Sequence, residues 1–93
     1  MIKTFRGKAA AMVFVGEVPK GLPSQIARVA KRKLTALDVA RRLDDLRQPP
    51  GNRLEALAGD RSGQHSIRVN DQWRVCFIWR DGDVYEVEIV DYH

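Results

Sequence analysis

The spacing of apolar residues changes once along this 93-residue chain, and that change constrains the fold more than any other feature. Before the segment RQPPGN, at residues 47–52, apolar residues recur every three or four positions, which is typical of a helix. After it they alternate at every second position, which is typical of half-buried strands. The two consecutive prolines lack amide donors and therefore end the helical half. Helices followed by strands predict an α+β fold, with the helices on one face of an antiparallel sheet.

The first half of the chain is predicted to hold two helices after a short opening strand, IKTF, at residues 2–5. The alanine-rich segment KAAAMVFVGE predicts a short helix that stops at Gly16. Pro23 is well placed to open a second helix. The apolar stripe of this helix comprises Ile26, Val29, Ala30, Leu34 and Leu37, and is extended by Ala40, Leu43 and Leu46. The cations between Lys31 and Arg42 mostly fall off this stripe, so they form either a solvated helix face or a docking surface.

Four strand-like runs follow, RLEAL, QHSIRV, WRVCFIW and VYEVEIVDY, separated by GDRSG, NDQ and DGD. If NDQ and DGD are both three-residue hairpin loops, the large apolar residues share one face, which takes the helices. That apolar set is Ile67, Val69, Trp73, Val75, Phe77, Trp79, Tyr85, Val87 and Ile89. The opposite face then collects Ser66, Arg68, Arg74, Cys76, Ile78, Glu86, Glu88, Val90 and Tyr92. Two-residue loops would scatter the apolar set over both faces and are therefore rejected.

The uncovered face is expected to gather arginines next to the carboxy-terminal tail. Arg68 and Arg74 would lie side by side across the first hairpin, with Tyr92 diagonal to Arg74. A phosphate between the two arginines would stabilise this arrangement, because arginine offers a planar fork of donors to its oxygens. Alternatively, Glu86 and Glu88 on the neighbouring strand neutralise the arginines in a surface network.

Further candidates lie next to these arginines. Arg53 and Glu55 alternate along RLEAL and can point at the same surface, and Arg61 lies in the loop GDRSG. Together with Arg68, Arg53 and Arg61 are the expected RNA-binding residues. If the ligand is RNA, cleavage without a metal needs a base for the 2′-OH proton, cations for the phosphorane, and an acid for the departing 5′-oxygen. These three roles fit, in that order, Glu55 or Asp91, Arg68 with Arg74, and His93 or Tyr92. Asp91 has the parity of the core face, so the alternative for it is a cap or an orienting partner for a neighbour. The other histidine, His65, is expected to pack at the edge of the core.

Composition and residue counts narrow the class of protein. A length of 93 residues predicts one domain, residues 1–93, and 44% hydrophobic with 30% charged residues is typical of a globular chain. No run is long enough to cross a bilayer and no signal peptide is recognisable, which predicts a cytoplasmic protein without membrane contact. The single cysteine, Cys76, excludes an internal disulfide and is expected to fill space in the core. With two histidines there is no zinc spacing, so no metal or cofactor is expected.

Several of these segments together resemble the HigB toxins of bacterial toxin–antitoxin systems, within the RelE/ParE superfamily. The resemblance rests on MIKTF at the start, on GDR.G..SI at residues 59–67, on WR at Trp73 and Arg74, and on the closing DYH. It implies a RelE-like fold, with a short first strand, two helices, and an antiparallel sheet of about four strands whose open face bears the active site. By position, it assigns Arg74, Asp91, Tyr92 and His93 to the catalytic end.

The resemblance also implies an activity and partners. HigB toxins are ribosome-dependent endoribonucleases that cut messenger RNA and are neutralised by HigA, a helix-turn-helix antitoxin. The expected partners are therefore the ribosome with its mRNA and a HigA-like antitoxin, with operator DNA reached only through the antitoxin. Where active relatives carry a histidine and a lysine, this sequence has Glu55 and Ala58, which makes Glu55 as base a hypothesis. The alternative is a non-nucleolytic toxin of the same fold, either a ParE-like gyrase inhibitor or a ribosome-binding inhibitor.

Overall fold

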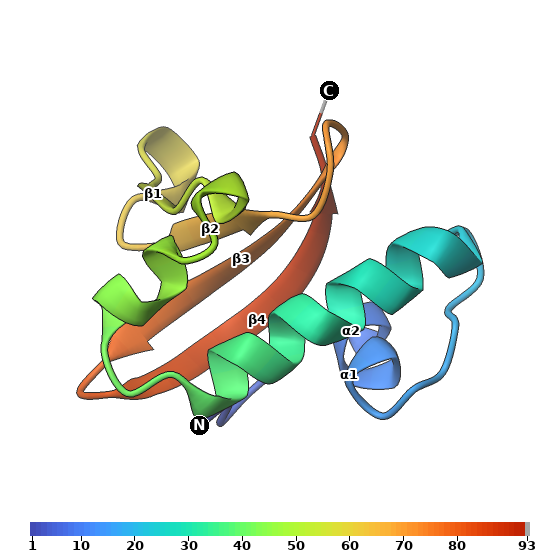
Figure 1. Cartoon of the computed structure of the whole chain (residues 1–93), viewed down its shortest axis with the longest axis horizontal. Helices are drawn as coiled ribbons and strands as arrows, with labels where there is room; N and C mark the ends of the chain where they lie inside the picture. The colour runs from blue at the N-terminus through green and yellow to red at the C-terminus, as the bar shows by residue number, and fades with distance from the viewer. Residues whose placement is uncertain (93) are drawn as a thin grey trace.

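Two helices cover one face of an antiparallel sheet in the computed structural model, which describes residues 1–92 (Figure 1). Within those residues the sheet has four strands in the order β1-β2-β3-β4. The main elements are α1 Lys8–Phe14, α2 Ser24–Val39, β1 Glu55–Ala56, β2 His65–Arg68, β3 Trp73–Arg80 and β4 Asp83–Asp91. Three short 3-10 helices join the two halves and the first strands, η1 Leu43–Arg47, η2 Pro50–Asn52 and η3 Gly59–Arg61. The predicted α+β layout is confirmed. No helix in the described part is long and apolar enough to span a membrane.

The amino-terminal segment lies beside β4 instead of forming a regular strand. Ile2 makes a parallel bridge to Val84, and Phe5 makes a second one to Val87. Between the two bridges the ladder is interrupted, because the backbone of β4 kinks at Glu86, whose φ is +52°. The predicted opening strand is therefore extended and paired, but only at two separate points.

The apolar stripe of α2 packs on the inner face of the sheet. Leu34 and Leu37 are fully buried, as are Val75 and Phe77 of β3. Each such side chain stabilises the fold by about 1.5–3 kcal/mol relative to leaving it exposed. Pro23 immediately precedes α2, and Gly16 follows the end of α1 with a φ of +93°, both as predicted.

The second helix ends earlier than the predicted stripe. It stops at Val39, Ala40 is extended with ψ 135°, and the chain re-forms a turn as η1. The Asp45 carboxylate accepts hydrogen bonds from the amides of Arg41 and Arg42, both at 3.0 Å. Such side-chain acceptors compete with the helical ladder for amide donors, which ends α2 before Leu46. Leu46 is still buried, because η1 folds back onto the core.

The loop at residues 70–72 has the predicted register. Arg68 lies opposite Arg74, and the Val69 amide donates to the Trp73 carbonyl at 2.9 Å, which closes a three-residue loop.

His65 stacks on Phe77 with ring centroids 6.2 Å apart, at the edge of the core as expected.

The turn between β3 and β4 differs from the prediction. It has two residues, Asp81 and Gly82, both with positive φ, and Arg80 pairs with Asp83. A β-bulge between Cys76 and Ile78 then shifts the register, so that Cys76 pairs with Glu88 as a three-residue loop would require. The predicted register of β3 against β4 is therefore correct from Cys76 and Glu88 toward the far end of the hairpin, and wrong between the bulge and the turn.

The bulge changes which side chains reach the core. Val84 is fully buried, whereas Tyr85, predicted on the apolar face, pairs with Ile78. The Arg80 guanidinium lies over the Tyr85 ring, 5.0 Å from its centroid. A two-residue turn alone would scatter the apolar residues over both faces, and the bulge prevents this by reversing the parity of the strand once more.

Candidate functional site

The carboxy-terminal tail is docked against the loop at residues 70–72 up to Tyr92. The Tyr92 amide donates to the Gln72 carbonyl, and the Gln72 side-chain amide donates to Asp91 Oδ2 at 3.2 Å. Asp91 is exposed and lies opposite Trp73. His93, the remaining predicted member of this tail, lies outside the described residues.

Asn70 gives this loop its shape. Its side-chain Oδ1 accepts hydrogen bonds from the amides of Gln72 at 2.9 Å and of Trp73 at 2.8 Å. An Asn side chain that accepts from amides two and three residues ahead mimics a backbone turn and stabilises the loop locally. The loop therefore provides a fixed support for the tail.

An open hollow of about 340 Å³ lies next to the docked tail. Five of the predicted site residues line it, coming from four separate segments of the chain. These are Arg53, Glu55, Arg68, Arg74 and Tyr92, and they are joined by Asn70 and Asp71. Arg74 and Tyr92 therefore lie on the same side of the sheet, and none of the described residues that line this hollow belongs to α1 or α2.

The Arg74 guanidinium is held by neutral acceptors. Its Nε donates to Ser66 Oγ at 2.8 Å, and its Nη2 donates to the Arg53 carbonyl at 2.8 Å. The Arg74 side chain is only 12% exposed, and the Ser66 side chain is fully buried. Arg74 Nη2 also lies 3.5 Å from Glu55 Oε1, which belongs to a half-exposed side chain. The direction of the cation is thus fixed, and among residues 1–92 the accessible Glu55 carboxylate is the acid paired with it.

The predicted alternative, in which Glu86 and Glu88 neutralise the arginine pair, is wrong. Within residues 1–92, Arg68 forms its ion pair with Asp71, next to it on the hairpin loop, and Arg74 with Glu55. Glu88 lies instead 2.5 Å from a nitrogen of Arg61.

Arg61 has a different environment from the arginines of the hollow. Its Nη1 donates to Glu88 Oε1 and, at 3.1 Å, to Gln64 Oε1. The hydrogen bond with Glu88 raises the pKa of the Arg61 guanidinium further above its usual value. Arg61 is absent from the lining of the hollow. The prediction that it binds RNA stays a prediction, and the geometry assigns it an internal partner.

Three residues of the site were not among the predicted functional residues. Ser66 orients Arg74, Asn70 shapes the loop, and Asp71 pairs with Arg68. For Ser66 the signal was present, because its position places it on the same face as Arg74. For Asn70 and Asp71 the signal is their place in the hairpin, because a loop next to that face places its own side chains beside it.

The arrangement brings together the groups that phosphodiester chemistry requires. A phosphate in the hollow would meet the fixed Arg74 cation, the Glu55 carboxylate and the Tyr92 phenol, which is 36% exposed. A cation stabilises developing negative charge, a carboxylate accepts a proton, and a phenol donates one. Cys76 lies behind this face, fully buried, and burial raises the pKa of its thiol.

The sequence matches known toxins over nearly its whole length. Residues 3–93 match the profile of the family described as "RelE-like toxin of type II toxin-antitoxin system HigB". The chain is 36% identical to Endoribonuclease HigB of Proteus vulgaris over 93 residues, which cover both proteins completely. It is 52% identical to Toxin HigB-1 of Vibrio cholerae over 61 residues, which cover 66% of this chain and 64% of that protein.

Solved structures share the fold at low identity. A YafQ mutant from E. coli aligns with a TM-score of 0.61 and 14% identity, covering 98% of this chain and 91% of the other. The YoeB–YefM complex from Staphylococcus aureus contains a chain that aligns with a TM-score of 0.57 and 14% identity, covering 100% of this chain and 98% of the other. The predicted fold is therefore confirmed by proteins that differ in most of their residues.

Proposed function

Because this chain belongs to the HigB-like family of RelE-like toxins of type II toxin–antitoxin systems, we propose that it is a ribosome-dependent endoribonuclease that cleaves translated mRNA. The activity is supported by the full-length similarity to a protein named Endoribonuclease HigB. The single observation that carries it is the convergence of Arg74, Glu55 and Tyr92 on one open hollow. A toxin that acted only through a protein surface would not need this set of groups around one hollow.

In the proposed reaction, a base removes the proton of the 2′-OH, and the 2′-oxygen attacks the adjacent phosphorus. Glu55 is the candidate for the base, because its carboxylate lines the hollow that would hold the phosphate. Asp91, the other predicted base, is not among the described residues that line this hollow, and it accepts a hydrogen bond from the Gln72 side chain. The bond to the 5′-oxygen breaks, which leaves a 2′,3′-cyclic phosphate on one fragment. Tyr92 or His93 donates the proton that the departing 5′-oxygen takes up.

Arg74 stabilises the charge that builds on the phosphorane. Its orientation is set before the substrate arrives, since Ser66 and the Arg53 carbonyl hold the guanidinium. Preorganised donors of this kind contribute most in a site from which water is excluded. Arg53 and Arg68 also line the hollow and would bind phosphates next to the scissile bond.

The proposed partners follow from the same family. A free toxin harms its host, so a HigA-like helix-turn-helix antitoxin is expected to bind this chain, and operator DNA would be contacted only through that antitoxin. The solved YoeB–YefM complex supports pairing within this fold. The ribosome and its mRNA complete the proposed set, and the proposed location is therefore the cytoplasm. Size-exclusion chromatography after co-expression with the neighbouring gene tests the antitoxin, and separate elution of the two products would contradict it.

Mapping mRNA 5′ ends after induction tests the activity. We expect discrete cuts within codons for the natural chain, and neither cuts nor growth inhibition for Tyr92→Ala or for deletion of His93. Tyr85→Ala is the matched control, because Tyr85 contacts Arg80 at the other end of the sheet and should leave the cuts unchanged. Growth inhibition without any cuts would favour the non-nucleolytic alternative, a gyrase inhibitor or a ribosome-binding inhibitor.

A further inference from the structure

A second hollow, of about 350 Å³, adjoins the proposed active site on the side of α2. Arg32 and Lys33 of α2 line it together with Asn52 of η2 and Arg68 of β2. Arg68 is shared, since it lines both hollows. We call this region the basic hollow.

The basic hollow gathers positive charge, and the one acid paired with a cation of its lining, Asp71 with Arg68, lies outside that lining among the described residues. Of the described residues that line it, three are cations and none is acidic. The pKa of the Lys33 ammonium is lowered by burial and by the nearby Arg32 and Arg68 cations, so these groups are close enough to repel one another. Like charges held around one open space are stabilised when an anion lies between them.

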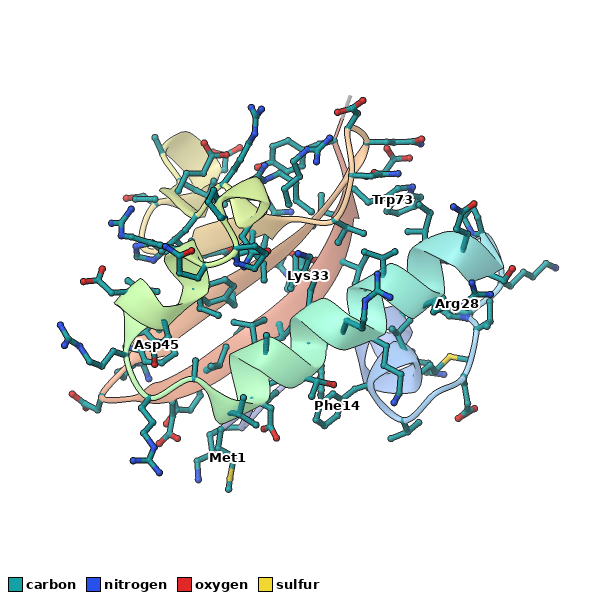
Figure 2. All side chains as sticks on the ribbon, viewed as in Figure 1. Met1, Phe14, Arg28, Lys33, Asp45 and Trp73 are labelled. Atoms are coloured by element: carbon teal, nitrogen blue, oxygen red, sulfur yellow. The ribbon has the colours of Figure 1, made fainter. Side chains whose placement is uncertain are left out.

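Local structure holds Lys33 in this position. Its Nζ donates to Asn52 Oδ1, and the Asn52 side-chain amide donates to the carbonyls of Leu46 and Gln48, both at 3.1 Å. Asn52 is itself 99% buried. Figure 2 shows Lys33 on the side of α2 toward η2, whereas Arg28 lies nearer the amino-terminal end of the helix. The ammonium is therefore positioned by the fold, which distinguishes it from a freely moving surface lysine.

We infer that the basic hollow binds backbone phosphates of RNA, so that a strand cut beside Arg74 continues over Arg68 to Arg32 and Lys33. The identification of the anion as RNA rests on the proposed function. Continuity through Arg68 favours RNA over an acidic protein segment, because a polyanion bound at the first hollow meets the second along the same edge. The phosphates belong either to the substrate strand or to ribosomal RNA.

Binding of a non-cleavable, 2′-O-methylated single-stranded oligonucleotide tests this, with fluorescence anisotropy measured over a range of salt concentrations. Arg32→Gln and Lys33→Gln are the test variants, and Arg32 is exposed, so its substitution leaves the core intact. Arg28→Gln is the matched control, because it removes one exposed charge from the same helix but lines a different hollow. Each cation that binds a phosphate contributes about 0.7 to the slope of log K against log salt, so each test variant should make that slope shallower by this amount.

The two sources of phosphate give different results. If the test variants weaken binding of the free oligonucleotide, the phosphates are those of the substrate strand. If they weaken only binding to ribosomal subunits that carry no mRNA, the phosphates are those of ribosomal RNA. If both variants match Arg28→Gln in both assays, or weaken only antitoxin binding, the inference is wrong.

The inference and the proposed function can fail separately. If the natural chain cuts mRNA while both variants bind RNA like the control, the inference about the basic hollow is wrong and the proposed activity stands. If the natural chain never cuts mRNA but binds RNA, and Arg32→Gln weakens that binding, the proposed activity is wrong and the inference about the basic hollow stands. Tyr92→Ala should retain the salt dependence of the natural chain, because Tyr92 lines only the first hollow of the two.

Discussion

Two arginines on the outer side of the sheet differ in how their charge is used. The side chains of Arg61 and Arg74 are 29% and 12% exposed, so both are largely withdrawn from water. Arg61 donates to the Glu88 carboxylate, which is itself only 19% exposed, and thus forms a closed ion pair. Arg74 is held mainly by a hydroxyl and a carbonyl, next to a carboxylate that solvent reaches.

The difference lies in the acceptors. A buried carboxylate neutralises the charge of its arginine, and the ion pair then has a structural role within the fold. Neutral acceptors set the direction of a guanidinium but leave most of its charge for an incoming anion. A buried arginine therefore indicates an anion-binding site only when its hydrogen-bond acceptors are mostly neutral. Arg74 has such acceptors, whereas Arg61 does not.

The largest expected effect comes from removing the Arg74 cation. Arg74→Ala should lower the mRNA cleavage rate by about 10²–10³-fold, the usual loss when one donor to a transition-state anion is deleted. Single-turnover cleavage on programmed ribosomes measures it. Arg61→Ala is the comparison variant, with the rate corrected for the folded fraction. Equal losses in the two variants would remove the distinction between the two arginines.

The second prediction tests whether Glu55 is the general base, with the substitution Glu55→Gln. As the proposed base, Glu55 should contribute about 10²-fold or more to the rate, and its amide cannot accept the proton. The pH dependence of cleavage should lose its acidic limb in this variant, which a positional role would not change. Unchanged cleavage would exclude Glu55 from the mechanism.

Arg61→Met addresses stability instead of activity. It leaves the Glu88 carboxylate largely buried with Arg6 as a distant cation, at 4.0 Å. We expect a loss of about 1–3 kcal/mol in the free energy of unfolding, the range for leaving a buried polar group without its partner. Urea denaturation measures the loss, and the double variant Arg61→Met with Glu88→Gln should recover part of it. A stable single variant would show that the pair is not structural.

The smallest expected effect concerns Cys76, which lies opposite Glu88 on the adjacent strand. Because burial raises the pKa of its thiol, alkylation of the native protein should be slower than that of the urea-unfolded chain. Equal rates in native and unfolded protein would contradict the buried position.

The sequence alone was sufficient for the layers and for part of the site. The change of period at residues 47–52 predicts helices on one face of an antiparallel sheet, because one apolar stripe and one apolar sheet face must bury each other. The loop at residues 70–72 places Arg68 opposite Arg74, since a hairpin of known loop length sets the pairing of its strands. Alternation along the strands then brings Tyr92 to the same side.

Tertiary structure decided what depends on partners distant in the sequence. The bulge that turns Tyr85 away from the core occurs where the Glu86 amide donates to Thr4, 82 residues earlier. The pairing of Arg61 with Glu88 and the carbonyl of Arg53 on Arg74 likewise join separate segments. The alternation of side chains along a strand predicts on which side of the sheet a residue lies. It does not predict which acceptor a long side chain reaches. Which arginine stays available to a phosphate is therefore a property of the folded chain.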